Sequence, residues 1–187
     1  MFLNSNLNGK AYSILNKYFI NFNEHIFSDE SSIENGKALL DFSLDNLRGT
    51  LDFMTPEIES LQIEVLYLIQ TLIKFLQAEA EAYLEKIIKL ILTILKKQCF
   101  IEDCFTVLTS IAYSNKNKIL DFIEPILASI EIGFDTKSPL IIGKSSLLIG
   151  AVFFNLGPLG EDYIENSFDQ LFRLLEDPDV DNTRDYY

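Results

Sequence analysis

Apolar residues recur at helical spacing along most of this chain, and the pattern repeats about every forty residues. Shifting the sequence so that residue 65 aligns with residue 104, and residue 104 with residue 145, brings three sets of positions into register. Every aligned position is apolar or Cys except Ser145. The sets are Val65, Ile69, Leu72, Leu84, Ile88 and Ile91, then Cys104, Leu108, Ile111, Ile123, Leu127 and Ile130, then Ser145, Ile149, Val152, Ile164, Phe168 and Leu171. Such self-similarity is typical of stacked helical repeats, in which each helix pair buries its apolar face against its neighbours.

We therefore predict an all-α fold, an α-α superhelix (solenoid) of about four helical hairpins. The predicted hairpins cover residues 7–48, 57–98, 101–135 and 139–177, and an acidic tail covers 178–187. The first hairpin follows the common register least well, so the count falls to three if residues 31–48 form no second helix. Because neither end carries a polar capping repeat, we expect a segment of a longer solenoid.

Local signals mark some of the turns between these helices. Thr55 and Pro56 predict a helix start, because Thr accepts a hydrogen bond from a free N–H group and Pro fits the first turn. The sequence Gly157-Pro158-Leu159-Gly160 predicts a break, and Gly133 predicts a boundary between units. The turn near 78–82 contains neither Gly nor Pro, so one long helix is the alternative to a hairpin there.

The formal net charge is −13, from 15 basic and 28 acidic residues. Such a surface repels phosphate backbones and anionic lipids, so we expect neither a nucleic-acid partner nor a membrane-surface role. It attracts basic peptides or proteins. Solubility explains the charge equally well, because a net charge away from zero is ordinary.

Other features bear on the cellular compartment. Residues 1–10 have neither a basic start nor an apolar run, so no signal peptide is expected. Apolar runs such as 147–154 are too short to span a bilayer, so no membrane insertion is expected. Cys99 and Cys104 have no second Cys pair or His partner, so we interpret them as small buried hydrophobic residues, not as zinc ligands or a disulfide framework. These features indicate a soluble protein in a reducing compartment.

Candidate catalytic residues are few. His25 follows Glu24, but adjacent residues on a helix point about 100° apart and do not face each other. Gly143-Lys144-Ser145 matches the end of a phosphate-binding loop motif, but Ser138 stands where that motif needs Gly. We therefore expect no catalytic activity, no cofactor and no metal.

Acidic residues recur in the same register as the apolar positions. Glu85, Glu124 and Glu165 superimpose under the two shifts, on the polar sides of the predicted second helices. Glu131 lies seven residues after Glu124, and Asp169 lies four after Glu165, so each shares its neighbour's helix face. In a solenoid, equivalent helices lie side by side, so these carboxylates predict a binding site for a basic segment. A solvated acidic face without a partner is the alternative.

Five aromatic residues lie on the predicted first helices of the hairpins: Tyr67, Phe75, Tyr113, Phe153 and Phe154. We expect most of them in the core, because Phe and Tyr usually bury their rings. One or two are expected to border grooves between neighbouring first helices, where an apolar side chain of a peptide could bind.

Several stretches resemble the later HEAT repeats of the importin-β family. They are Glu102-Asp103 with the Cys-Phe-Thr-Val-Leu-Thr-Ser-Ile that follows, Leu120-Asp-Phe-Ile-Glu-Pro125-Ile-Leu, and Leu148-Ile-Gly150 followed by Glu165 and Leu171. Ala11-Tyr12 is similar to the Ala-Tyr-Glu segment that the family has two repeats earlier. The chain departs from the family at Ala151, where Asp is usual, and it contains no Trp.

The resemblance implies a nuclear transport receptor of the cytoplasm, nucleus and nuclear pore. Its second helices would bind a basic import signal or adaptor arm, with Glu124 and Glu165 at the family's acidic positions and Glu85 added by register. Its first helices would accept Phe-Gly nucleoporin repeats. The alternative is a HEAT-repeat scaffold subunit that organises a phosphatase- or chromosome-associated complex. A receptor should bind a basic arm in a salt-dependent way, whereas a scaffold should not.

Overall fold

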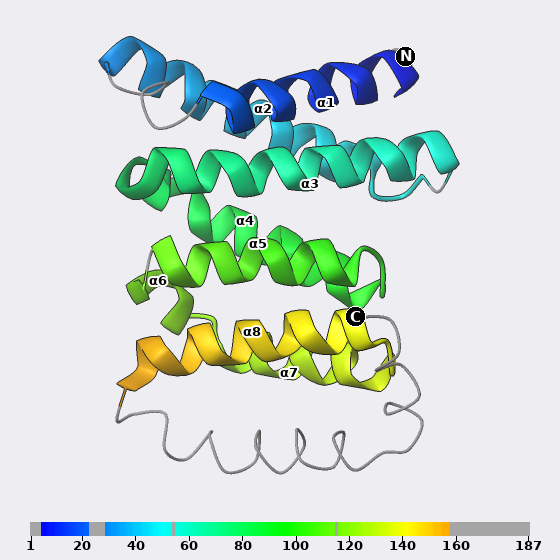
Figure 1. Cartoon of the computed structure of the whole chain (residues 1–187), viewed down its shortest axis with the longest axis vertical. Coiled ribbons are helices and arrows are strands. Elements are labelled where there is room, and N and C mark those ends of the chain that lie inside the picture. The colour runs from blue at the N-terminus through cyan, green and yellow to red at the C-terminus, as the bar shows by residue number, and fades with distance from the viewer. Residues whose placement is uncertain (1–4, 23–28, 54, 115, 158–187) are drawn as a thin grey trace. The chain divides into compact units, whose positions relative to one another are not determined.

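The computed structural model describes residues 5–22, 29–53, 55–114 and 116–157, and every element in these ranges is helical (Figure 1). The elements are α1 (Ser5–Phe22), α2 (Glu30–Thr50), α3 (Pro56–Leu76), the 3-10 helix η2 (Gln77–Ala80), α4 (Glu81–Lys96), α5 (Ile101–Ser114), α6 (Lys116–Leu120), α7 (Ile123–Asp135) and α8 (Pro139–Leu156). The all-α prediction is confirmed for this part of the chain. The second helix predicted for the hairpin 139–177, with Ile164, Phe168 and Leu171, lies outside the described residues.

The chain divides into two compact units, residues 1–90 and 91–187, which we call unit 1 and unit 2. The division falls within α4, so the last turns of this helix belong to unit 2. Each unit is described by itself below.

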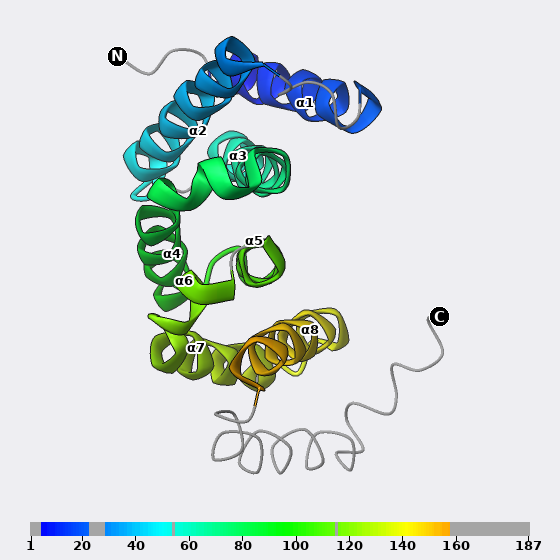
Figure 2. The ribbon, with the colours of Figure 1, turned by 90° about the vertical axis from the view of Figure 1, so that its left-hand side faces the viewer.

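Unit 1 is built around α3, which contacts both α1 and α2. Figure 1 shows α1 and α3 side by side, and in the view of Figure 2 α2 lies to the left of α3. The buried side of α3 includes Val65, Leu68, Ile69 and Leu72, each at most 1% exposed. This wide apolar stripe explains why α3 can pack against two helices at once.

Ion pairs connect α2 to the elements after α3 in unit 1. The Lys86 ammonium lies 2.7 Å from Asp41 Oδ1 and 3.5 Å from Asp45 Oδ1, and Lys37 lies 2.6 Å from Glu79 Oε2. The hydrogen bond to Asp41 raises the pKa of Lys86. These pairs link α2 to η2 and to the start of α4.

Unit 2 packs α8 against both α5 and α7, and the short α6 contacts α5 and α8. Figure 2 shows α5 and α8 on one side of this unit and α7 on the other. Phe105 of α5 is the largest fully buried side chain. Asn155 of α8 donates a hydrogen bond from Nδ2 to the Ala112 carbonyl oxygen of α5 at 2.7 Å, which ties the C-terminal ends of these two helices together.

Most of the positions predicted to lie in the core are buried in the structure. All aligned positions from Val65 to Ile111 are buried, and so are Ser145, Ile149 and Val152. Ile123 and Leu127 are only half-buried. Both lie in the first half of α7, on either side of the fully buried Ile126.

The helix boundaries confirm one expected signal and correct others. Thr55 caps α3, with its hydroxyl oxygen accepting from the Ile58 N–H at 3.4 Å, and Pro56 is in the first turn. The single long helix considered near 78–82 is wrong: the 3-10 helix η2 separates α3 from α4, and Gln77 adopts a φ of 47°. After α5 the chain forms α6, so α7 begins only at Ile123.

Gly133 lies in the last turn of α7, which ends two residues later at Asp135, so it is close to the boundary that the sequence predicts. It is buried within α7, where a Cβ would overlap Ser145 Oγ and lie 2.5 Å from Phe105 Cε2. Gly is therefore required for α7 to approach α5 and α8 this closely.

The helix α8 is long and apolar enough to cross a membrane by length and composition, with a mean hydropathy of 1.6. The core helix of a soluble protein meets the same criterion when it is mostly buried, whereas 28% of this window of α8 is buried in the described part of the chain.

Candidate protein-interaction surface

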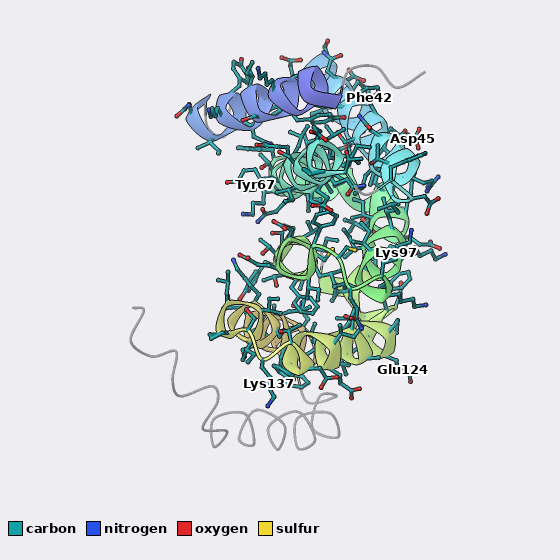
Figure 3. All side chains as sticks on the ribbon, turned by 90° about the vertical axis from the view of Figure 1, so that its right-hand side faces the viewer. Phe42, Asp45, Tyr67, Lys97, Glu124 and Lys137 are labelled. Carbon is teal, nitrogen blue, oxygen red and sulfur yellow. The ribbon has the colours of Figure 1, made fainter. Side chains whose placement is uncertain are left out.

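Among the described helices of unit 2, α7 carries an acidic face. Glu124, Ala128, Glu131 and Asp135 are all exposed and follow one another at intervals of four, three and four residues. Side chains at these spacings share one helix face. Figure 3 labels Glu124 at the beginning of this face. Because α7 contains no Lys or Arg, nothing in the helix itself offsets these carboxylates.

Glu85 lies in a different electrostatic setting, on α4 in unit 1. Its carboxylate is exposed but forms an ion pair with Lys89, one helical turn later. Lys86 adds another positive charge beside it, although that ammonium is paired with α2. A basic ligand at Glu85 has to compete with Lys89, so the face of α4 attracts cations less than the face of α7.

The structure tests the predicted site residues unequally. Glu85, Glu124 and Glu131 are exposed, as binding requires. Glu165 and Asp169 lie outside the described residues. Because Glu85 belongs to unit 1 and Glu124 to unit 2, the continuous row of carboxylates stays a prediction.

Sequence reasoning missed both an acidic residue and the compensating lysines. Asp135 extends the α7 face, and its spacing of four from Glu131 is visible in the sequence. The spacing of four between Glu85 and Lys89 is equally visible, and it predicts the intrahelical ion pair that the structure contains.

The expectation that most of the five aromatic residues are in the core is wrong. Tyr67, Tyr113 and Phe154 are 44%, 61% and 69% exposed, and Phe75 and Phe153 are half-buried. The expectation failed because the buried face of each helix covers only part of its circumference. Aromatic residues also occur on the part that faces solvent.

Tyr113 and Phe154 are exposed aromatic residues of unit 2. They lie on neighbouring helices, α5 and α8, and each is adjacent in sequence to one partner of the hydrogen bond between Asn155 and Ala112. Exposed aromatic rings suit an apolar side chain of a peptide.

The two cysteines are free, with Cys104 buried and Cys99 half-buried. Burial raises the pKa of the Cys104 thiol, and the nearby Asp103 raises it further. A thiol kept protonated in this way is a poor nucleophile and a poor metal ligand. Among the described residues, no group of three or more His, Cys, Asp or Glu side chains could hold a metal ion.

Gly143, Lys144 and Ser145 lie within α8, more than one turn after it begins at Pro139. A phosphate-binding loop needs these residues at the turn before a helix, where backbone N–H groups are free. Here Ser145 is buried, and its hydroxyl donates to the Ile141 carbonyl oxygen at 2.8 Å.

No family model, curated protein or solved structure matches this chain. The all-α class therefore rests on the structure itself, and the resemblance to importin-β stays a prediction from the sequence.

Proposed function

We propose that this chain is a non-catalytic protein-binding segment of a HEAT-repeat solenoid, of the kind found in importin-β-like nuclear transport receptors. Its partner is a basic protein segment, such as an import signal or an adaptor arm. It acts in the cytoplasm and nucleus and at the nuclear pore, where Phe-Gly repeats are a second partner.

The helix packing within each unit supports the repeat architecture. In unit 1, α1 and α3 pack together, with α2 against α3. In unit 2, α5 and α8 pack together, with α7 against α8. First helices of successive hairpins therefore contact each other in both units, as stacked helical repeats require.

The observation that carries the proposed partner is the acidic face of α7, with Glu124, Glu131 and Asp135 exposed and no basic residue in the helix. Carboxylates on one face suit a segment that carries several Lys or Arg residues. Each exposed ion pair contributes only about 0.2–1 kcal/mol, so affinity comes from several contacts made at once. The exposed rings of Tyr113 and Phe154 support Phe-Gly repeats as the second partner.

The experiment that tests this proposal is a fluorescence anisotropy titration of the whole chain with a labelled arginine-rich peptide, at low and at physiological salt. We expect binding that weakens by about tenfold as salt rises, because exposed charge pairs are screened. The control is the same peptide with citrulline in place of arginine, which keeps the shape but removes the charge.

Salt-dependent binding of the arginine peptide, with little binding of the citrulline peptide, would support the proposal. Equal binding of both peptides, or none of either, would overturn it, and a scaffold function would then be the better account.

A further inference from the structure

One face of α8 in unit 2 is exposed although it carries no charged or polar side chain. Its exposed residues follow one another at intervals of three and four, so they form a single stripe along the helix. This α8 stripe consists of Leu140, Gly143, Leu147, Gly150 and Phe154. Its three large side chains are 48%, 56% and 69% exposed, in chain order. A continuous apolar stripe of this kind marks a surface that another element covers.

The size of the stripe does not suit a second copy of the chain. At these exposed fractions, two Leu side chains and one Phe present on the order of 350 Å², well below the about 800 Å² that each partner buries in a stable interface. Two copies would also bring together chains that each have a net charge of −13. A contact within one chain needs less area, because its two surfaces are already linked.

The chain itself supplies a covering element directly after α8. The helix ends at Gly157, which has a φ of 53° and donates a hydrogen bond from its N–H to the Phe153 carbonyl oxygen. Pro158 follows, so the helix cannot continue in the same direction. Residues 161–177, which we call the C-terminal segment, come next; they lie outside the described residues, so their position is inferred from the sequence.

The apolar residues of the C-terminal segment mirror the α8 stripe. In two antiparallel helices, residues equally far from the turn lie at the same height, because both helices rise by the same amount per residue. Counted from Leu159 in the turn, four pairs match: Phe154 with Ile164 at five residues, Gly150 with Phe168 at nine, Leu147 with Leu171 at twelve, and Gly143 with Leu175 at sixteen.

This pairing places a large side chain opposite each glycine of the stripe. A Cβ at Gly143 or Gly150 would meet no atom within 4 Å, so both positions have free space above them. At the separation of about 8–10 Å usual between packed helix axes, a position with no side chain or a single methyl group leaves room for a large side chain of the neighbour. Phe168 fits over Gly150 and Leu175 over Gly143 for this reason.

We propose that the C-terminal segment of the same chain forms a helix that covers the α8 stripe, antiparallel to α8. Leu171 packs against Leu147 at the middle of the contact. In this arrangement α8 is a core helix and not a membrane span. The segment also covers Phe154, so Phe-Gly repeats compete with it for this ring and find Tyr113 open. The proposal does not depend on the basic partner proposed above.

The test is disulfide formation in the whole chain, with Leu147→Cys and Leu171→Cys introduced in a Cys99→Ser background. Oxidised glutathione is added, and the cross-linked peptides are identified by mass spectrometry. The control pairs Leu147→Cys with Arg173→Cys, two residues further on and on the opposite side of the predicted helix. We expect the first pair to form its intramolecular disulfide at least about tenfold faster, because a disulfide needs Cα atoms within about 7 Å.

Equal rates for the two pairs would overturn the proposal. A disulfide between two chains of the Leu147→Cys variant, formed in preference to the intramolecular one, would also overturn it and would make a second copy the occupant of the stripe.

A second measurement needs no disulfide. The thiol of Leu147→Cys, again with Cys99→Ser, is modified with a maleimide. Adding Leu171→Glu puts a charge into the apolar contact, so we expect modification about 5- to 10-fold faster, with circular dichroism showing that the chain stays folded. The control Arg173→Glu should change the rate less than twofold. A rate that Leu171→Glu leaves unchanged would contradict the proposal.

Discussion

Replacing Gly133 with alanine should lower the free energy of unfolding of unit 2 by about 2–3 kcal/mol. Gly133 is buried in α7 at its closest approach to α5 and α8. An alanine Cβ there would overlap Ser145 Oγ and lie 2.5 Å from the Phe105 ring. Phe105 and Ser145 are both fully buried, so neither can move away without disturbing the core.

The size of the effect is measured by urea unfolding, followed by circular dichroism. Gly150→Ala on α8 is the matched control, because a Cβ at this exposed position would meet no atom within 4 Å. The control should be neutral or stabilise by up to about 1 kcal/mol, since Ala favours helices over Gly. Adding Ser145→Gly to Gly133→Ala should recover part of the lost stability, because the two sites are in contact. Equal stabilities of the Gly133→Ala and Gly150→Ala variants would contradict this packing.

Removing the charges of the α7 face should weaken binding of the arginine-rich peptide by about tenfold. The variant combines Glu124→Gln, Glu131→Gln and Asp135→Asn, all at exposed positions. Three exposed contacts of about 0.2–1 kcal/mol each add up to this range when the peptide spans them. The measurement is the same anisotropy titration at low salt.

The control for this variant removes three charges elsewhere, with Glu30→Gln, Asp52→Asn and Glu81→Gln at exposed positions of unit 1. Both variants change the formal net charge from −13 to −10. If the affinity depended only on net charge, the two variants would bind equally, and the α7 face would not be the site. We expect the control to retain most of the wild-type affinity.

The helical class and most of the core follow directly from the sequence. The periodic positions of α3 and α5 are buried as predicted, because an apolar stripe at 3.6-residue spacing leaves a helix few ways to pack. Thr55 and Pro56 placed the start of α3 for an equally local reason. These features depend on residues that are close together in the sequence, so they can be predicted without knowing which helices pack together.

Other features depend on contacts between helices and could not be predicted in this way. Gly133 lies near the end of α7, as its sequence suggests, but the need for Gly there comes from Phe105 of α5 and Ser145 of α8, which leave no room for a Cβ. Ser145, the one polar residue in the aligned register, is explained by the same approach, since it lies against Gly133. The close packing of α7 against α8 therefore explains why both positions hold small residues.

The candidate site was predicted in part. Exposure of Glu124 and Glu131 follows from their place on the polar side of the helix. The ion pairs that Lys86 forms with Asp41 and Asp45 join two helices far apart in sequence, and no sequence pattern links them. Contacts of this kind become visible only when the packing is known.

The most direct test of the account is to map where a basic segment contacts the chain. An arginine-rich peptide that carries a benzophenone side chain is irradiated with the whole protein, and the cross-linked residues are identified by mass spectrometry. We predict adducts within residues 121–135, at a yield that falls with the α7 variant and with citrulline in place of arginine. Adducts that avoid α7, or form equally with the citrulline peptide, would contradict the central claim.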